Sequence, residues 1–204
     1  MMFRFDRRPF RLSIIVPLFA VSAILSLTAC SAVDELTSIV EKEPPPPCPR
    51  IKLLKDADII TVYRPGSGRD ITDIRYEAEL KGFFGECDYV GKSRVYSKVN
   101  LTLRISYDIS RGPAERDNLI KVPYFIAIPK YYPRPEGRSE FVSTVKFIEN
   151  RDNMVVVDDE IAISLPLGKG QTGPETNVYI GFVLTKDQLD FNRENRRATG
   201  LSNP

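Results

Sequence analysis

The stretch of sequence that decides the fold is Val99-Asn100-Leu101-Thr102-Leu103-Arg104-Ile105-Ser106-Tyr107-Asp108-Ile109-Ser110. Every odd-numbered residue in it is apolar, and every even-numbered residue is polar or charged. Successive side chains of a β-strand point to opposite faces of a sheet, so a period of two predicts one buried and one solvated face. The run therefore predicts a long, half-buried strand.

Shorter runs of the same kind lie on both sides of it. Residues 74–81 alternate between apolar and charged side chains, whereas residues 122–128 are almost continuously apolar, as in a strand covered on both faces. Further strands are predicted at residues 59–63, 141–147, 154–157, 161–165 and 178–184. Segments rich in Gly, Pro, Asn and Asp separate these runs and predict turns.

Several short strands with frequent turns and no intervening helix predict an all-β chain with antiparallel pairing, folded as a β-sandwich. An immunoglobulin-like sandwich is the favoured form. The chain has no Trp for the usual core position of antibody domains, and no Cys pair that spans two central strands, so the antibody type is excluded. A small closed β-barrel is the alternative.

The period of the pattern changes near the C-terminus. Thr185-Lys186-Asp187-Gln188 fits a capping box, with Thr185 as N-cap and Gln188 as the reciprocal residue. A short C-terminal helix is therefore predicted from about residue 186 to residue 196, with residues 198–204 as a frayed tail. The folded domain is predicted to span residues 49–197.

Composition excludes several classes of function. The chain has 204 residues, of which 42% are hydrophobic and 27% charged, which is typical of a globular protein. It contains no His, and this excludes His-dependent nucleophiles, bases and metal sites. After residue 29 the charges nearly cancel, with 25 basic and 26 acidic residues, so no nucleic-acid partner is expected.

The N-terminus has the pattern of a secretory signal. Four Arg occur in the first eleven residues, and residues 12–29 then carry no charge. A retained membrane-spanning helix is the alternative for a run of this length. The run ends in Leu27-Thr28-Ala29-Cys30, which resembles the lipobox of bacterial lipoproteins.

That resemblance implies removal of residues 1–29 as a signal peptide and acylation of Cys30, for example with palmitate. The covalent lipid on Cys30 would anchor the protein to a membrane, and no other cofactor is expected. Ser31 is similar to the residue that follows the modified Cys in lipoproteins passed on to the outer membrane. The expected location is therefore the cell envelope, at the outer membrane and facing the periplasm.

Residues 30–48 are predicted to form a tether. Pro44-Pro45-Pro46-Pro47 forces an extended polyproline II segment. At ~3.1 Å per residue the stretch from Cys30 to Cys48 reaches roughly 55 Å when fully extended. Residues 31–43 fit either a short amphipathic helix or a flexible spacer.

Two cysteines remain after Cys30. The compartment beyond the inner membrane is oxidising, and an even remainder there predicts one disulfide, between Cys48 and Cys87. Two free, buried thiols are the alternative.

No catalytic set is evident. Asp158-Asp159-Glu160 is the densest acidic cluster, but its spacing is not that of an EF-hand, and we expect a solvated hairpin end. The glycine-rich segments at 66–69 and 168–173 lack the phosphate-loop spacing and are expected to be flexible hairpin loops. No GxSxG motif is present. We expect no metal site and no enzyme, with a cryptic hydrolase as a remaining alternative.

The candidate binding patch is Tyr131, Tyr132 and Arg134, with Phe83-Phe84 as a second aromatic pair. The alternative is that one ring of each pair points inward and the other covers a sheet edge. The sequence predicts a non-catalytic envelope lipoprotein that presents a β-sandwich to a protein partner, or else a module that binds peptidoglycan or another glycan. Residues 181–189 are similar to segments of small, uncharacterised envelope lipoproteins, which implies no activity.

Overall fold

The computed structural model describes residues 44–66, 68–92, 95–148 and 151–198. The predicted signal peptide, Cys30, the segment 31–43 and residues 199–204 of the predicted tail lie outside these ranges. Within them, no helix has both the length and the apolar character needed to cross a membrane.

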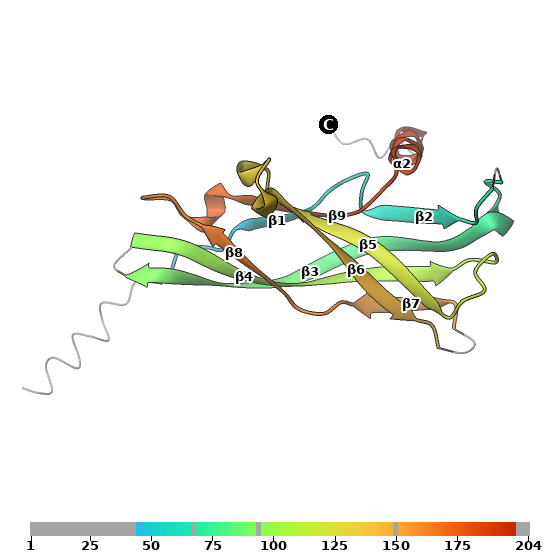
Figure 1. The fold of residues 1–204 in the computed structure, drawn as a ribbon, viewed down its shortest axis with the longest axis horizontal. Coiled ribbons are helices and arrows are strands. Elements are labelled where there is room, and N and C mark those ends of the chain that lie inside the picture. The colour runs from blue at the N-terminus through green and yellow to red at the C-terminus, as the bar shows by residue number, and fades with distance from the viewer. Residues whose placement is uncertain (1–43, 67, 93–94, 149–150, 199–204) are drawn as a thin grey trace, which may run out of the picture. The chain divides into compact units, whose positions relative to one another are not determined.

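Two sheets face each other in a sandwich (Figure 1). The first has the order β1-β9-β5-β6, formed by Arg50–Leu53, Asn177–Phe182, Leu119–Ala127 and Arg138–Lys146. The second has the order β2-β3-β4, with β7 and β8 both paired to the far side of β4. Its strands are β2 Ile59–Tyr63, β3 Ile74–Lys92, β4 Val95–Arg111, β7 Asn153–Val157 and β8 Ile161–Pro166. The predicted all-β sandwich is confirmed, and the closed barrel is not formed.

The connectivity differs from that of an immunoglobulin domain, where the last two strands pair with each other. Here β8 pairs with β4 in one sheet, whereas β9 pairs with β5 and β1 in the other. The pairing of β1 with β9 is parallel, so the expectation of antiparallel pairing is wrong for this one ladder. The chain leaves β1 for the opposite sheet, and no hairpin therefore forces an antiparallel neighbour on it.

Strand β4 carries the core of the second sheet. Its odd-numbered residues from Val99 to Ile109 are at most 1% exposed, as the period of two predicts. From the opposite sheet, Phe182 meets the ring of Tyr107 edge-on, with ring centroids 5.9 Å apart. The other residues that β5 and β9 contribute to this core include Val122, Tyr124, Ile126, Val178 and Ile180.

The C-terminal helix α2 spans Lys186–Ala198 and begins with the predicted capping box. The backbone N–H of Thr185 donates to Oε1 of Gln188 at 2.9 Å, and the N–H of Gln188 donates to Oγ1 of Thr185 at 3.3 Å. Helix start and capping residues are therefore those that the sequence predicts, and the helix runs two residues further than expected.

Adjacent residues of β4 face opposite sides of the sheet, so their substitution should lower the free energy of unfolding by very different amounts. Ile105→Ala should lower the free energy of unfolding by about 2–5 kcal/mol, because it leaves a cavity in a fully buried site. Arg104→Ala, on the outer face in an exposed ion pair with Glu160, should cost less than about 1 kcal/mol. Urea unfolding of both variants checks this, and similar losses at the two positions would contradict the assignment of faces.

Candidate functional site

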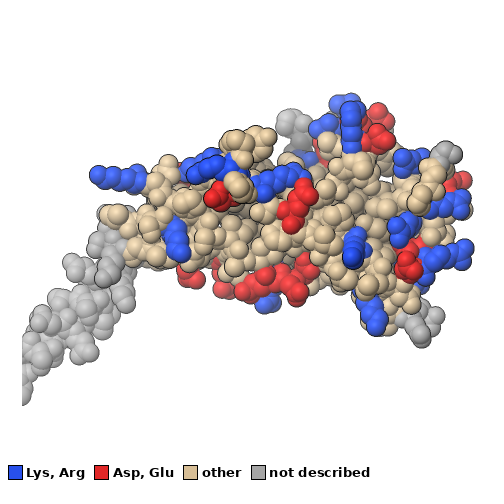
Figure 2. All heavy atoms as spheres, in the orientation of Figure 1, with Lys and Arg blue, Asp and Glu red and all other residues tan. Residues whose placement is uncertain are grey.

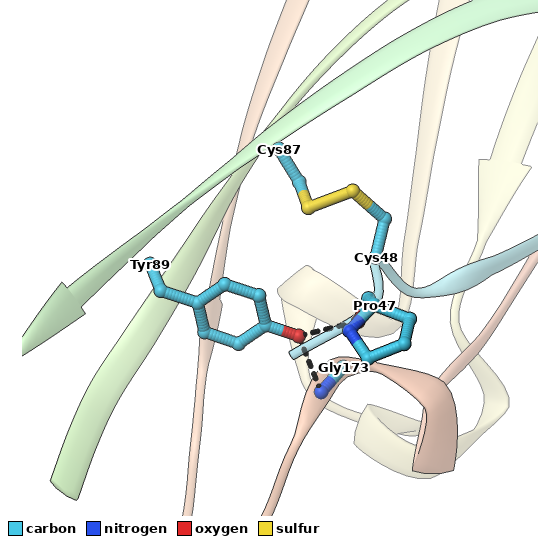
Figure 3. Close-up of a disulfide and its surroundings, with 5 residues drawn as sticks. All are labelled: Pro47, Cys48, Cys87, Tyr89 and Gly173. Atoms are coloured by element: carbon cyan, nitrogen blue, oxygen red, sulfur yellow. Dashed lines mark hydrogen bonds between the residues drawn. A yellow bond between two sulfur atoms is a disulfide. The ribbon is translucent and has the colours of Figure 1, made fainter. Parts of the chain in front are cut away.

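The folded domain begins at a covalent attachment. Cys48 and Cys87, 39 residues apart in sequence, form a disulfide with their Cα atoms 5.8 Å apart (Figure 3). The predicted pairing of the two cysteines is thus confirmed. It fixes the last residues of the polyproline segment to strand β3.

A second contact holds the same segment. The hydroxyl of Tyr89 donates to the carbonyl oxygen of Pro47 at 2.7 Å and accepts from the backbone N–H of Gly173 at 2.8 Å (Figure 3). A Cβ at position 173 would collide with this hydroxyl, so the close approach requires glycine. The C-terminal end of the glycine-rich segment 168–173 is therefore fixed in place, unlike the flexible loop expected from its composition.

The predicted aromatic patch lies at this same end of the domain, between β5 and β6. Tyr131 is buried, with its hydroxyl donating to the carbonyl of Pro166 at 2.6 Å. The guanidinium of Arg134 stacks on the ring of Tyr131, 5.0 Å from its centroid. Tyr132, by contrast, is 75% exposed. One ring of this pair therefore points inward and the other is exposed, which agrees with the alternative interpretation on the inward ring.

The second aromatic pair behaves differently. Phe83 and Phe84 lie in the part of β3 that pairs with β4 alone, and they are 37% and 66% exposed. Neither ring is buried, so the expectation that one of them points inward is wrong here. Phe84 borders a hollow of about 440 Å³ on the outer face of the second sheet, together with Arg104, Val157 and Glu160.

The acidic cluster also differs from its prediction. Strands β7 and β8 pair with consecutive parts of β4, so Asp158-Asp159-Glu160 forms an interruption in one long edge and not a hairpin end. The backbone N–H of Asp158 donates to the carbonyl of Ile105, which keeps the bulged segment against β4. The chain bends at this point and directs the Asp158 side chain toward the opposite sheet.

Asp158 there completes a polar network that links the two sheets. The Tyr107 hydroxyl donates to Ser143 Oγ, and Ser143 donates to Oδ1 of Asp158, each at 2.7 Å. Tyr124 donates to Oδ2 of Asp158, also at 2.7 Å. Burial raises the pKa of Tyr107 to about 12. Burial, followed by the hydrogen bond to Asp158, also raises the pKa of Tyr124.

Ser143 lies at the centre of this network. Ser143 is only 2% exposed, and its hydroxyl is held between a phenol and a carboxylate. Asp158, Asp159 and Glu160 do line a hollow of about 370 Å³. In the described ranges, however, no group of three Asp, Glu, Cys or His side chains is placed to hold a metal ion. We interpret the network as structural, because its hydrogen bonds join the two sheets, and we call it the clamp.

Sequence reasoning missed this clamp, although one signal for it exists. Ser143 stands at an inward position of β6, between Phe141 and Val145, where the alternation calls for an apolar residue. A polar residue in such a position needs a hydrogen-bond partner. The identity of that partner is not readable from the sequence, because Asp158 and Tyr107 come from other strands.

The disulfide should contribute measurably to stability. Cys48→Ser combined with Cys87→Ser should lower the free energy of unfolding by about 2–4 kcal/mol, since the bond closes a long loop in the unfolded chain. Denaturant unfolding under non-reducing conditions checks this, with Cys30→Ser as the control that leaves the disulfide in place. An unchanged transition midpoint would show that the contact of Tyr89 suffices without the bond.

The buried tyrosines predict a loss of stability at alkaline pH. Burial raises the pKa of Tyr76 and of Tyr107 from 10.0 to about 12 in the folded protein. Folding therefore favours the protonated phenols, and stability is complete below pH 10.0 and falls as the pH rises toward about 12. Chemical unfolding at a series of pH values checks this. Tyr107→Phe should show a shallower decline, and an identical decline would contradict the contribution of Tyr107.

No protein-family model matches this chain, and no match exists among curated proteins or solved structures. The function must therefore be argued from the residues themselves.

Proposed function

We propose that this protein is a non-catalytic envelope lipoprotein, anchored by a lipid on Cys30, whose β-sandwich binds a protein partner at the membrane. One observation carries the proposal, namely the double attachment of Pro47 and Cys48 to the end of the sandwich through Tyr89 and Cys87. A segment that served only as a loose leader would need neither contact. The attachment sets which end of the domain is nearest to the anchor.

The proposed orientation follows from that attachment. The end that carries the disulfide, Tyr89 and the Tyr132 loop faces the membrane, within roughly 55 Å of it for a fully extended tether. The opposite end, with the β2–β3 and β4–β5 connections, faces away, and Figure 2 shows many Lys and Arg side chains there. The location that fits this arrangement is the periplasmic face of the outer membrane, as Ser31 suggests.

The outer face of the second sheet is the surface best suited to a protein partner. Phe84 of β3 and Val155 and Val157 of β7 are 66%, 70% and 54% exposed, on the two strands that flank β4. Contiguous exposed apolar side chains with polar residues at their border are typical of protein-binding surfaces. Phe84 and Val157 line one hollow together with Arg104 and Glu160, which pair with each other at 3.2 Å.

A glycan-binding module is the second candidate, because Tyr132 stands exposed beside Arg134. The burial of Tyr131 leaves Tyr132 as the exposed ring of the predicted patch. Binding of the protein to purified peptidoglycan, lost on Tyr132→Ala, would favour this candidate over a protein partner.

Site-specific crosslinking in cells tests the proposal. A photoreactive amino acid at position 84 should give a reproducible adduct with one envelope protein, identified by mass spectrometry. The same residue at Val142, 59% exposed on β6 of the other sheet, is the matched control and should give none. The adduct should disappear in a Cys30→Ala chain, since the unanchored domain no longer reaches its partner.

Two results would contradict the proposal. Equal adducts from positions 84 and 142 would mean that the apolar face has no special role. Unchanged mass and unchanged membrane fractionation of the Cys30→Ala chain would exclude the lipid anchor. An adduct that contains only glycan would move the assignment to the second candidate.

A further inference from the structure

Helix α2 covers the free edge of strand β2 through side-chain amides. Nε2 of Gln188 donates to the carbonyl of Thr61 at 2.8 Å, and Nδ2 of Asn192 donates to the carbonyl of Ile59 at 2.8 Å. The two amides lie one helical turn apart, on the same side of α2. Figure 1 shows α2 nearly end-on above β2, at the margin of the second sheet.

The bonded carbonyls are those that point away from the sheet. The backbone carbonyl of Asp58 accepts from the N–H of Leu80. Asp58, and then Ile60, are therefore the residues whose backbone groups form hydrogen bonds with β3. In an antiparallel ladder such residues alternate with residues whose backbone groups face the other side. Ile59 and Thr61 therefore present their N–H and C=O groups at the free edge, where a further strand would bind.

Helix α2 is held on β2 mainly by polar contacts. For this reason we infer that the helix can detach from the strand. Asn192 is the single buried residue of α2, and the apolar Phe191 is 46% exposed. Towards its C-terminus the helix is held by ion pairs of Arg196 with Asp56 and Asp58. Helix packing in globular proteins rests mainly on a buried apolar face, which α2 lacks.

We propose that the β2 edge is a latent dimerisation surface, on which a second copy of this chain pairs antiparallel when α2 moves away. Two copies of β2 match each other in antiparallel pairing when Thr61 of one copy lies opposite Thr61 of the other. A two-fold axis there places Ile59 opposite Tyr63, a β-branched residue opposite an aromatic ring, which is a favourable cross-strand pair. It also places Asp58 opposite Arg64, a pair of opposite charges.

Asp58 and Arg64 also link the state in which α2 covers β2 to the proposed dimer, in which α2 has moved away. Arg196 binds Asp58 only while α2 is in place, so release of the helix frees this carboxylate for Arg64 of the second copy. The side chain of Arg64 is 62% exposed, although it also contacts Asp73 of its own chain. This self-complementarity favours a second copy over an unrelated strand as the occupant.

The test uses the full chain in non-ionic detergent, with micelles in large excess over protein. Gln188→Ala combined with Asn192→Ala removes both amide donors and should strengthen dimerisation by at least about tenfold in analytical ultracentrifugation. Glu194→Ala with Arg197→Ala, at exposed positions of the same helix, is the matched control and should leave the association of the wild type unchanged. Circular dichroism verifies that each variant is folded, and Asn192→Ala alone replaces the double variant if that one unfolds.

Two further measurements identify the pairing surface. Thr61→Pro, added to the variant with Gln188→Ala and Asn192→Ala, removes a backbone N–H that faces the free edge. It should restore the monomer without unfolding the domain, because proline is tolerated on strand edges. Hydrogen exchange at Thr61 and Tyr63 should slow as the protein concentration rises. A folded variant that stays monomeric, a dimer insensitive to Thr61→Pro, or an assembly that contains a different protein would each overturn the proposal.

Discussion

The structure depends on the strict alternation of strand β4. Its inward residues fill one side of the core, and its backbone pairs with β3 along one edge and with β7 and β8 along the other. A shift of one residue would turn every buried side chain of such a strand toward water. The register of four strands is thus fixed by the apolar pattern of a single one, and the opposite sheet packs on the face so formed.

The margins of the sandwich are protected by several different means. Exposed strand edges invite pairing with other chains, and proteins block them with short strands, bulges, charges or covering elements. Here β1 has four residues, the β7–β8 edge is broken at Asp158-Asp159-Glu160, and α2 covers β2. Edge strand β6 carries Arg138 and Glu140 as an exposed ion pair. Of these devices, the cover on β2 is held by side-chain amides and ion pairs.

Hydrogen bonds and the disulfide fix both the attachment of the incoming chain and the contact between the two sheets. At one end, Tyr89 and the disulfide attach the incoming chain, and the buried Tyr131 holds the neighbouring loop by its hydroxyl. Between the sheets, the clamp of Tyr107, Ser143 and Asp158 replaces apolar packing with hydrogen bonds. Partly satisfied polar networks are costly in a core, and this one has a partner for each hydroxyl. Under the proposed function, this attachment point would hold the domain in one orientation toward a partner.

The sequence by itself determined what depends on local pattern. The strand at residues 99–110, the capping box of Thr185 and Gln188, and the pairing of the two cysteines left after Cys30 follow from periodicity, short-range hydrogen bonding and counting. The tertiary structure alone decided what depends on contacts between distant segments. The parallel pairing of β1 with β9, the inward turn of Asp158 and the amide contacts of α2 with β2 join residues up to 133 positions apart. The exposure of Phe84 and the burial of Tyr131 belong to the same class, because the neighbours of a side chain, and not its type, determine whether water reaches it.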